Sequence, residues 1–359
     1  MILLIFWFIA YAFTVLFLIF GIQRLRVGQE ARKAISVDEL TVIIPFRNEA
    51  HNLPQILDSI RRQSYQPNQW IFVNDHSEDD FRSVFEELKN FPIRVLNLPE
   101  DQSGKKVALR YGMDHSTSNY TVTMDADVRF GKDYVKAMLV LPEMDMLILP
   151  VEMTGTKWWQ EFFNLEYRLT HILNKGISGW FRPINASGAN LLFNQAVFDE
   201  VNDISEHEHI ASGDDIFALK AFRDTNKTIA VIEMDEVLVE TACPDTLSEV
   251  MHQRKRWLGK AGKVSDNLAN GVGVWMVLLH VIYLFFISSS FLYADWWMLL
   301  IYFLFKSFFD FALINVDIKR ISGKFLVGLL LFELFYPIYA IYLIFSLFFN
   351  DPEWKGREV

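Results

Sequence analysis

Apolar residues are concentrated near the two ends of the chain, whereas the middle alternates apolar and polar positions. The stretch Ile2–Ile22 is almost uncharged and is about as long as a helix that crosses a bilayer. It lacks a basic leader and a small-residue cleavage site before Gln23, so it indicates a retained anchor rather than a signal peptide. Buried core helices are the alternative for three later apolar stretches, but their length and near absence of charge favour membrane spans. These stretches are Val272–Leu292, Trp296–Ile314 and Phe325–Phe349.

The middle of the chain, from Leu40 onward, alternates short β-branched or aromatic runs with longer segments of helical periodicity. This alternation predicts an α/β domain with a mainly parallel sheet. The expected strands are Leu40–Pro45, Trp70–Val73, Ile93–Leu98 and Tyr120–Met124. The expected helices are Asn52–Gln63, Asp79–Leu88 and Lys106–Met113. No G-x-G-x-x-G sequence follows a strand, so a nicotinamide or flavin dinucleotide site is not indicated.

Composition agrees with a membrane protein that carries a soluble domain, since 52% of the 359 residues are hydrophobic and 32 of them are Phe. The formal charge of −10 argues against a nucleic-acid partner, because phosphate backbones require a basic surface. Cys243 is the single cysteine, so no disulfide can form within the chain and no Cys-based metal site is possible.

The distribution of Lys and Arg predicts the orientation in the membrane. Basic residues follow the first span and precede the second, which places the intervening domain in the cytoplasm. These residues are Arg24, Arg26, Arg32, Lys33, Arg254, Lys255, Arg256, Lys260 and Lys263, and the group Lys319, Arg320 and Lys324 agrees with them. Counting spans then puts the tail outside, unless Pro337 breaks the last stretch into a re-entrant segment or a hairpin.

Two carboxylates, Asp125 and Asp127, directly follow the predicted strand Tyr120–Met124. Open α/β sheets bind ligands outside the carboxyl ends of their strands. Hard divalent cations are often held there by one or two carboxylates together with substrate phosphates. Asp-x-Asp also occurs by chance in solvated loops, so the motif by itself leaves both interpretations open.

Polar residues follow two other predicted strands. The first strand is followed by Arg47, Asn48 and Glu49, and the second by Asn74 and Asp75. If these strands are neighbours, Asp75 faces the same crevice as the carboxylate pair. A turn or helix cap is an equally good explanation of Asp75, because Asp favours both positions.

Seven strings in order resemble the motifs of membrane-bound family 2 glycosyltransferases with the GT-A fold. They are TVIIPFRNEAHNL, WIFVNDHSEDD, GKKVAL, TMDAD, SGANLLF, SGDDIFALK and HQRKRW. The resemblance runs from Leu40 to Trp257 and includes the apolar segments on either side. QxxRW close to a membrane span is its most specific part, and it is seen in polysaccharide synthases and ceramide-type glucosyltransferases. The chain departs from the family where Asp214 replaces the usual Glu.

The resemblance implies a nucleotide-sugar donor, expected to be UDP-linked, and a bound Mg²⁺ or Mn²⁺ that suits oxygen ligands. Asp127 would be the direct metal ligand, and Asp125 would orient the ribose or the metal shell. Asp75 would bind the base or ribose, in a pocket shaped by Pro45 and Glu49.

A general base is also required, because the acceptor hydroxyl must lose its proton as it attacks. By resemblance this base is Asp215, the last carboxylate of SGDD. A helix that begins at Ile216 would help to keep Asp215 ionised. First-turn acids that cap this helix are the alternative for Asp214 and Asp215, and the role of Asp214, possible on the acceptor side, stays more open.

The segment 247–271 has an apolar side and a basic side, and it is expected to be an amphipathic helix at the membrane surface. Arg256 and Arg254 would contact the diphosphate, because a guanidinium binds it in a bidentate manner. Gln253 and Trp257 would line the acceptor site. Lys106 is a further candidate for the diphosphate. A solvated basic face is the alternative for the two arginines, and an exposed lysine at a helix start is the alternative for Lys106.

The expected organisation is an anchor (1–22), a basic linker (23–39), a cytoplasmic GT-A domain (40–246), an interface helix (247–271), three spans (272–349) and a tail (350–359). The expected function is inverting, metal-dependent transfer to a lipid or lipid-linked acceptor at a bacterial inner membrane. Inversion follows from one base and no evident nucleophile. Only three spans follow the domain, which is few for a polymer channel, so transfer of one sugar to a lipid acceptor is favoured. A processive polysaccharide synthase and a catalytically silent scaffold are the two alternatives. His207 and His209 are assigned to a solvated loop.

Overall fold

The computed structural model describes residues 2–27, 35–86, 90–202, 213–264, 266–316, 323–346, 353–354 and 357–358. The chain forms two compact units. The sheet unit comprises residues 29–152 and 185–242, and the helical unit comprises residues 1–28, 153–184 and 243–358. The loop predicted at His207 and His209 lies outside the described residues, as do Lys319 and Arg320.

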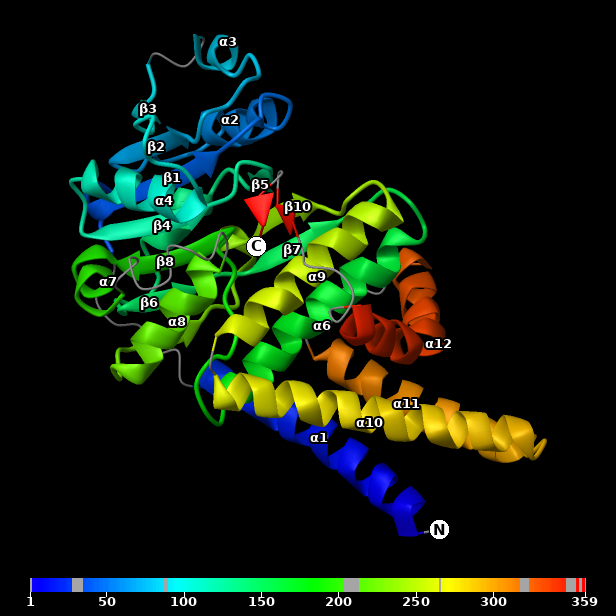
Figure 1. The fold of residues 1–359 in the computed structure, drawn as a ribbon. Helices are drawn as coiled ribbons and strands as arrows, with labels where there is room; N and C mark the ends of the chain where they lie inside the picture. The colour runs from blue at the N-terminus through cyan, green and yellow to red at the C-terminus, as the bar shows by residue number, and fades with distance from the viewer. Residues whose placement is uncertain are drawn as a thin grey trace. The chain divides into compact units, whose positions relative to one another are not determined.

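The sheet unit is built on seven strands in the order β3-β2-β1-β4-β8-β6-β9 (Figure 1). The strands are β1 Leu40–Phe46, β2 Gln69–Asn74, β3 Ile93–Asn97, β4 Tyr120–Met124, β6 Met146–Ile148, β8 Asn190–Asn194 and β9 Ile229–Val231. The first four in this order are parallel, and β8 is antiparallel to both β4 and β6. This mixed, mainly parallel sheet confirms the predicted α/β fold, and each of the four predicted strands is present.

The order of the strands places a ligand crevice beside β1. The chain runs outward through β2 and β3 and then returns to pair β4 with the other side of β1. In open α/β sheets such a reversal of strand order marks the crevice outside the carboxyl ends of the strands. Phe46 is paired with Asn74 and Ile43 with Thr123, so the ends of β1, β2 and β4 lie at one edge of the sheet.

The helices of the sheet unit pack against the strands and form the hydrophobic core together with them. They are α2 Leu53–Arg61, α3 Arg82–Phe85, α4 Lys105–Asp114, α5 Tyr134–Met138, α7 Gln195–Val201 and α8 Asp214–Asp224. One buried cluster joins Ile43 and Val73 of the sheet to Met113 of α4 and Phe222 of α8. Gly112 lets α4 approach the sheet, because a Cβ atom there would lie 2.6 Å from Ile43 Cγ2.

One helix prediction was wrong at its start. The helix expected from Asp79 begins at Arg82, because the Asp79 carboxylate accepts a hydrogen bond from Ala50 N (2.7 Å) in the loop after β1.

The remaining strands are β5 Val128–Phe130, which is antiparallel to β10 Val239–Ala242, then β7 Val151–Thr154, and the pair β11 Glu353–Trp354 and β12 Arg357–Glu358. Short 3₁₀ turns occupy Val37–Glu39 and Asp235–Val237.

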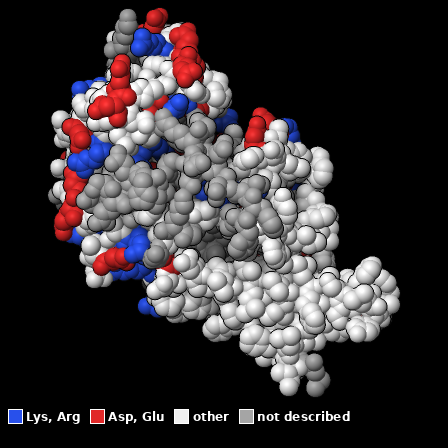
Figure 2. All heavy atoms as spheres, viewed as in Figure 1, with Lys and Arg blue, Asp and Glu red and all other residues white. Residues whose placement is uncertain are grey.

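Among the residues that the structure describes, the helical unit has four helices that are long and apolar enough to cross a membrane. They are α1 Ile2–Val27, α10 Asn267–Leu292, α11 Trp296–Asn315 and α12 Gly323–Ser346. Each coincides with a predicted span, and Figure 2 shows α1 and α10 as a nearly uncharged surface. α10 begins earlier than predicted, because Asp266 caps it by accepting from Leu268 N and Ala269 N. α12 is a single helical segment that includes Pro337, and the path of this segment in the membrane stays a prediction.

Two further helices of this unit, α6 Gln160–Ser178 and α9 Leu247–Lys263, are amphipathic and lie beside the apolar ones. α6 packs against both α1 and α12. The crossing with α1 is a backbone contact, because a Cβ atom on Gly21 would lie 1.9 Å from the carbonyl oxygen of Gly176. Small residues allow such close approach of helices.

A group of charged residues is buried among the apolar helices. Lys306 of α11 is fully buried, and its Nζ lies 2.5 Å from Asp310 and 2.9 Å from Glu333 of α12. Tyr11 of α1 donates a hydrogen bond to Asp310. Ionisable groups at such positions are costly unless they pair with one another, and this group links three of the four apolar helices.

Candidate active site

Four polar side chains of the sheet unit meet at the carboxyl end of β4. Asp125 follows this strand, and Lys105 Nζ of α4 lies 2.6 Å from Asp125 Oδ1. The same ammonium lies 3.9 Å from Asp214 Oδ2, at the start of α8. Asp215, the next residue of α8, accepts a hydrogen bond from Gly188 N (3.1 Å). Two motifs that are far apart in the sequence, TMDAD and SGDD, are therefore brought together around one lysine.

Two glycines set the helix starts that carry these side chains. Gly104 has φ +111° and precedes α4, and Gly213 has φ +92° and precedes α8. Glycine adopts this left-handed backbone without the steric cost that a side chain would add. Gly104 N also donates to Asp75 Oδ2 (3.1 Å), so Asp75, which is almost fully buried, holds the start of α4. This contact agrees with the capping role considered for Asp75, and it places the residue beside Lys105.

A third glycine, Gly188, keeps room for the acidic residues. A Cβ atom at this position would lie 3.0 Å from Asp214 Oδ2 and 3.4 Å from Lys105 Nζ. Asp215 is fixed on both oxygens, because Oδ1 accepts from Ile216 N (2.9 Å) and Oδ2 from Gly188 N. The two backbone N–H groups fix the orientation of this carboxylate.

The carboxylates at the end of β4 differ in their electrostatic surroundings. Burial, Asp125 and Glu49 raise the pKa of Asp127 to about 6, while Lys105 opposes the shift. Burial lowers the pKa of Lys105, but Asp125, Asp214 and Asp215 outweigh this effect and leave it above its ordinary value. Asp127 also accepts a long hydrogen bond from Thr241 (3.4 Å). Asp125 is thus paired with Lys105, whereas the carboxylates of Asp125 and Glu49 lie near Asp127.

Lys105, rather than Lys106, faces this group. The Lys106 side chain is only 3% exposed, and its Nζ lies 4.5 Å from the ring centroid of Phe217. The role expected of Lys106 at the diphosphate stays a prediction, but Lys105 is the lysine whose ammonium lies against Asp125. Of the other residues expected around the donor, Pro45 is buried within β1, and Glu49 accepts from Asn52 Nδ2 (2.7 Å).

The QxxRW residues lie on α9 of the helical unit. Arg254 is 2% exposed, and its Nε donates to Glu166 Oε2 of α6 at 2.8 Å. The guanidinium carbon lies 4.5 Å from the ring centroid of Trp257, and Gln253 Oε1 accepts a hydrogen bond from Arg254. The Arg254 guanidinium is turned into the protein, and its expected contact with a diphosphate stays a prediction. Arg256 is partly exposed and stays a prediction.

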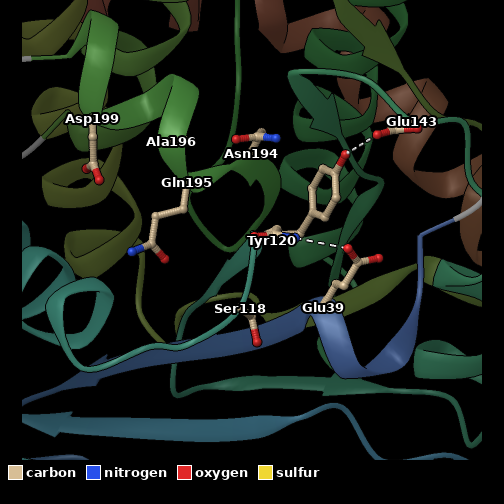
Figure 3. A pocket seen from close by; sticks show the side chains of 9 residues that line it. Glu39, Ser118, Tyr120, Glu143, Asn194, Gln195, Ala196 and Asp199 are labelled. Atoms are coloured by element: carbon tan, nitrogen blue, oxygen red, sulfur yellow. Dashed lines mark hydrogen bonds between the residues drawn. The ribbon is translucent and has the colours of Figure 1, made fainter.

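A separate cavity of about 330 Å³ lies at the opposite edge of the sheet (Figure 3). Its lining includes Glu39, Tyr120 and Glu143, and the Tyr120 hydroxyl donates to Glu143 (3.1 Å). Tyr120 begins β4, whereas Asp125 follows the end of this strand. The cavity therefore lies away from the acidic group.

The acidic group can provide ligands for a divalent cation. No set of three or more His, Cys, Asp or Glu side chains is arranged as a metal site among the residues that the structure describes. Two adjacent carboxylates suit a cation such as Mg²⁺ that keeps water or phosphate oxygens as its remaining ligands. Burial, followed by the charges of Asp125 and Glu49, raises the pKa of Asp127, and a bound cation would offset these charges.

Comparison with solved structures supports the expected GT-A fold. The chain superposes on the mannosyltransferase PcManGT of Pyrobaculum calidifontis, in complex with GDP-Man and Mn²⁺, with a TM-score of 0.57. The superposition covers 97% of this chain and 98% of that chain, at 16% sequence identity. At this identity the likeness concerns the fold.

Sequence relatives agree with this likeness. One segment is 31% identical to the glycosyltransferase GlyA of Streptococcus pneumoniae over 28% of this chain and 14% of GlyA. Another is 27% identical to the 4,4'-diaponeurosporenoate glycosyltransferase of Staphylococcus aureus, over 53% of this chain and 48% of that protein. The chain therefore spans less than half the length of either relative.

Two family profiles match the chain. Residues 41–197 match glycosyl transferase family 2, and residues 120–349 match glycosyl transferase family group 2. The second match extends over more than half of the chain and includes both acidic motifs together with α10, α11 and α12, whereas α1 lies outside it. The chain therefore belongs to glycosyl transferase family 2.

Proposed function

We propose that this protein transfers a sugar from a nucleotide-sugar donor to a lipid or lipid-linked acceptor at the membrane, with inversion at the anomeric carbon. The observation that carries the proposal is the convergence of Asp125 and Asp214 on Lys105, with Asp215 fixed beside them. This arrangement combines a site for a diphosphate and a cation with a nearby ionised carboxylate. Glycosyl transfer requires each of these parts.

The donor would bind at the carboxyl ends of β1, β2 and β4. Asp75 would contact the base or ribose, and Glu49 and Pro45 would shape that pocket. Asp127 would ligate Mg²⁺ or Mn²⁺, with Asp125 on the ribose or in the metal shell. A bound cation would supply neutralising charge to the leaving diphosphate. Lys105 takes the place that the sequence analysis gave to Lys106, because its ammonium already lies among these acidic side chains.

Asp215 would act as the general base. As the acceptor oxygen bonds to the anomeric carbon, the bond from that carbon to the diphosphate breaks, and the acceptor proton passes to the carboxylate. The two backbone N–H groups that donate to Asp215 support this role, because they fix the orientation of its carboxylate. One displacement inverts the anomeric configuration.

A UDP-sugar and a GDP-sugar are the two candidate donors. The sequence motifs favour a UDP-sugar, whereas PcManGT, which has the same fold, is in complex with GDP-Man and Mn²⁺. A panel of UDP- and GDP-sugars, assayed by nucleotide release from the full chain, separates these donors. Loss of release on addition of EDTA and its return with excess Mn²⁺ would support the metal.

Membrane insertion with the sheet unit in the cytoplasm is part of the proposal, supported by the four apolar helices. The acceptor would meet Trp257 and Gln253 of α9, with Asp214 on the acceptor side and Arg256 near the diphosphate. A relative named for 4,4'-diaponeurosporenoate favours a discrete acceptor over a growing polysaccharide. Product length on incubation with labelled donor distinguishes one transferred sugar from a polymer.

The test of the base is the variant Asp215→Asn. We expect it to abolish transfer while leaving donor binding intact, whereas the control Asp224→Asn, at the other end of α8, keeps normal transfer. Retained turnover in Asp215→Asn would disprove the assignment. If the wild-type protein releases nucleotide with no donor of the panel, the proposed activity itself is wrong, and a silent scaffold becomes the better explanation.

A further inference from the structure

Glu166, which is not part of the QxxRW motif, forms a buried ion pair with Arg254 within this motif. Glu166 lies on α6, 88 residues before Arg254, and its Oε2 accepts a hydrogen bond from Arg254 Nε at 2.8 Å. The side chains of this pair are 14% and 2% exposed, so both charges are largely removed from water. A buried guanidinium of this kind requires a partner, because leaving it alone would be costly.

Every nitrogen of the Arg254 guanidinium has an acceptor. Nη1 donates to Gln253 Oε1, and Nη2 faces the carbonyl oxygen of Phe163 (3.4 Å) and the sulfur of Met153 (3.7 Å). A planar fork with its donors satisfied has a fixed orientation. Each nitrogen is therefore engaged within the protein and the side chain is 2% exposed, so Arg254 is better placed to hold its neighbours than to bind a diphosphate.

Arg254 holds the two members of the motif that are expected on the acceptor side. Its donation to Gln253 Oε1 sets the direction of that amide. Its guanidinium also lies over the Trp257 ring, 4.5 Å from the centroid, a distance at which a cation is attracted to the ring. On the other side, Tyr167 of α6 contacts the same ring at 5.6 Å.

Glu166 also connects this arrangement to an apolar helix. Tyr339 of α12 donates to Glu166 Oε1 (3.2 Å), while Glu166 Oε2 binds Arg254. One carboxylate thus joins α12, α6 and α9, and α12 packs against both of the other two. The contacts run from a candidate membrane span, through Glu166 and Arg254, to Gln253 and Trp257.

We infer that Glu166 is a positioning residue for the QxxRW motif: through Arg254 it fixes the Gln253 amide and the Trp257 ring that receive the acceptor. This inference rests on the proposed function for the role of Gln253 and Trp257. The positioning itself stands on the contacts within the helical unit. Glu166 acts through Arg254 and touches neither substrate.

The test compares Glu166→Gln, which keeps the volume of the side chain and removes its charge, with the control Glu161→Gln on the same helix. In full-length protein in nanodiscs, we expect Glu166→Gln to lower kcat for transfer about 10- to 100-fold, the effect of a small misplacement of substrate-orienting groups. The donor KM should stay within about twofold, because the donor site lies on other residues. Glu166→Asp, which keeps the charge, should recover part of the rate.

A second readout does not depend on activity. The protein is labelled with 5-fluorotryptophan, and the ¹⁹F resonance of Trp257 is assigned by its loss in Trp257→Phe. We expect this resonance to shift in Glu166→Gln and to stay in place in Glu161→Gln. An unshifted resonance together with normal transfer in Glu166→Gln would overturn the inference.

A double variant separates positioning from stability. Glu166→Leu with Arg254→Met replaces both charges by apolar groups, a change that often preserves or raises stability. We expect this protein to unfold at the wild-type temperature and still to transfer about tenfold or more slowly. Wild-type transfer by the stable double variant would overturn the inference. If wild-type protein transfers no sugar at all, the proposed function fails, and the Trp257 resonance still tests the positioning.

Discussion

Lys105 and Asp125 form an ion pair at 2.6 Å, and the same lysine reaches Asp214 at 3.9 Å. The lysine thereby joins the end of β4 to the start of α8, the two places that carry the acidic motifs. Lys105 pairs with Asp125, whereas Asp127 lies near the carboxylates of Asp125 and Glu49, which supports the proposal that Asp127 is the ligand of a cation. The pairing thus accounts for the unequal roles of two carboxylates that are one residue apart.

Replacing Lys105 by Met should weaken donor binding. A hydrogen bond to a charged group is worth about 1.5–3 kcal/mol, so we expect the donor KM to rise about 10- to 100-fold. Lys105→Arg should keep part of the affinity, and Lys220→Met, a partly exposed position on α8, serves as the control. Nucleotide release at varied donor concentration measures the effect, and an unchanged KM in Lys105→Met would contradict the role.

Metal binding should depend on pH through Asp127. This carboxylate binds a cation only when ionised, and its pKa is raised to about 6. Lowering the pH from 7 to 5 therefore protonates it and should weaken Mn²⁺ binding about tenfold, which calorimetry can measure. Asp127→Asn should bind weakly at both pH values. Equal affinity of the wild-type protein at pH 7 and pH 5 would exclude Asp127 as a ligand.

Gly188→Ala should impair transfer with little loss of stability. The added Cβ would lie 3.0 Å from Asp214 Oδ2 and 3.4 Å from Lys105 Nζ, so these side chains must move by a few tenths of an ångström. We expect transfer to slow about tenfold, because the site depends on close alignment. Gly131→Ala is the matched control, since nothing lies within 4 Å of its Cβ position. Similar rates for the two variants would show that Asp214 and Lys105 tolerate displacement.

The buried charges among the apolar helices should matter for stability. Lys306→Met leaves Asp310 and Glu333 without their shared cation. Breaking a buried pair typically costs about 3–5 kcal/mol, so thermal unfolding in detergent should occur at a clearly lower temperature. Adding Asp310→Asn and Glu333→Gln should restore part of the loss. Lys324→Met, at an exposed position, controls for the loss of a lysine, and equal unfolding temperatures would contradict the pairing.

We expect that no side chain larger than hydrogen is tolerated at Gly21, where α1 crosses α6. A Cβ atom there would lie 1.9 Å from the Gly176 carbonyl oxygen, so the helices must separate. We expect Gly21→Ala to destabilise the protein by about 1–3 kcal/mol, as overpacking does. Gly271→Ala in α10 meets nothing within 4 Å and should be tolerated. Thermal unfolding of both variants in nanodiscs measures the difference.

Local patterns were sufficient to predict most elements of the fold. Tyr120–Met124 was predicted at its observed bounds, because a buried strand there is flanked by polar residues on both sides. The four apolar helices followed from length and lack of charge. The helix start predicted at Asp79 was too early, because the Asp79 carboxylate accepts a hydrogen bond from Ala50 N in another loop. A side chain that caps a distant segment leaves no local signal.

The sequence predicted less of the candidate site than of the fold. The motifs indicated which segments meet, but not which of two adjacent lysines faces the carboxylates, since a shift of one residue turns a helical side chain by about 100°. Glu166 was missed because its partner lies 88 residues away. A charged residue among Phe162, Phe163 and Leu165 on the buried side of a helix was the available signal.

The packing of α6 bears on any attempt to obtain a water-soluble form of this enzyme. The first and last apolar helices, α1 and α12, both rest on this helix from the middle of the chain. Deleting residues 2–27 would uncover the Gly176 face of α6 and remove Tyr11 from Asp310. Deleting α12 would remove the Tyr339 hydroxyl from Glu166. Trimming either end therefore opens the interior of the helical unit, and the enzyme is better purified with its apolar helices in place.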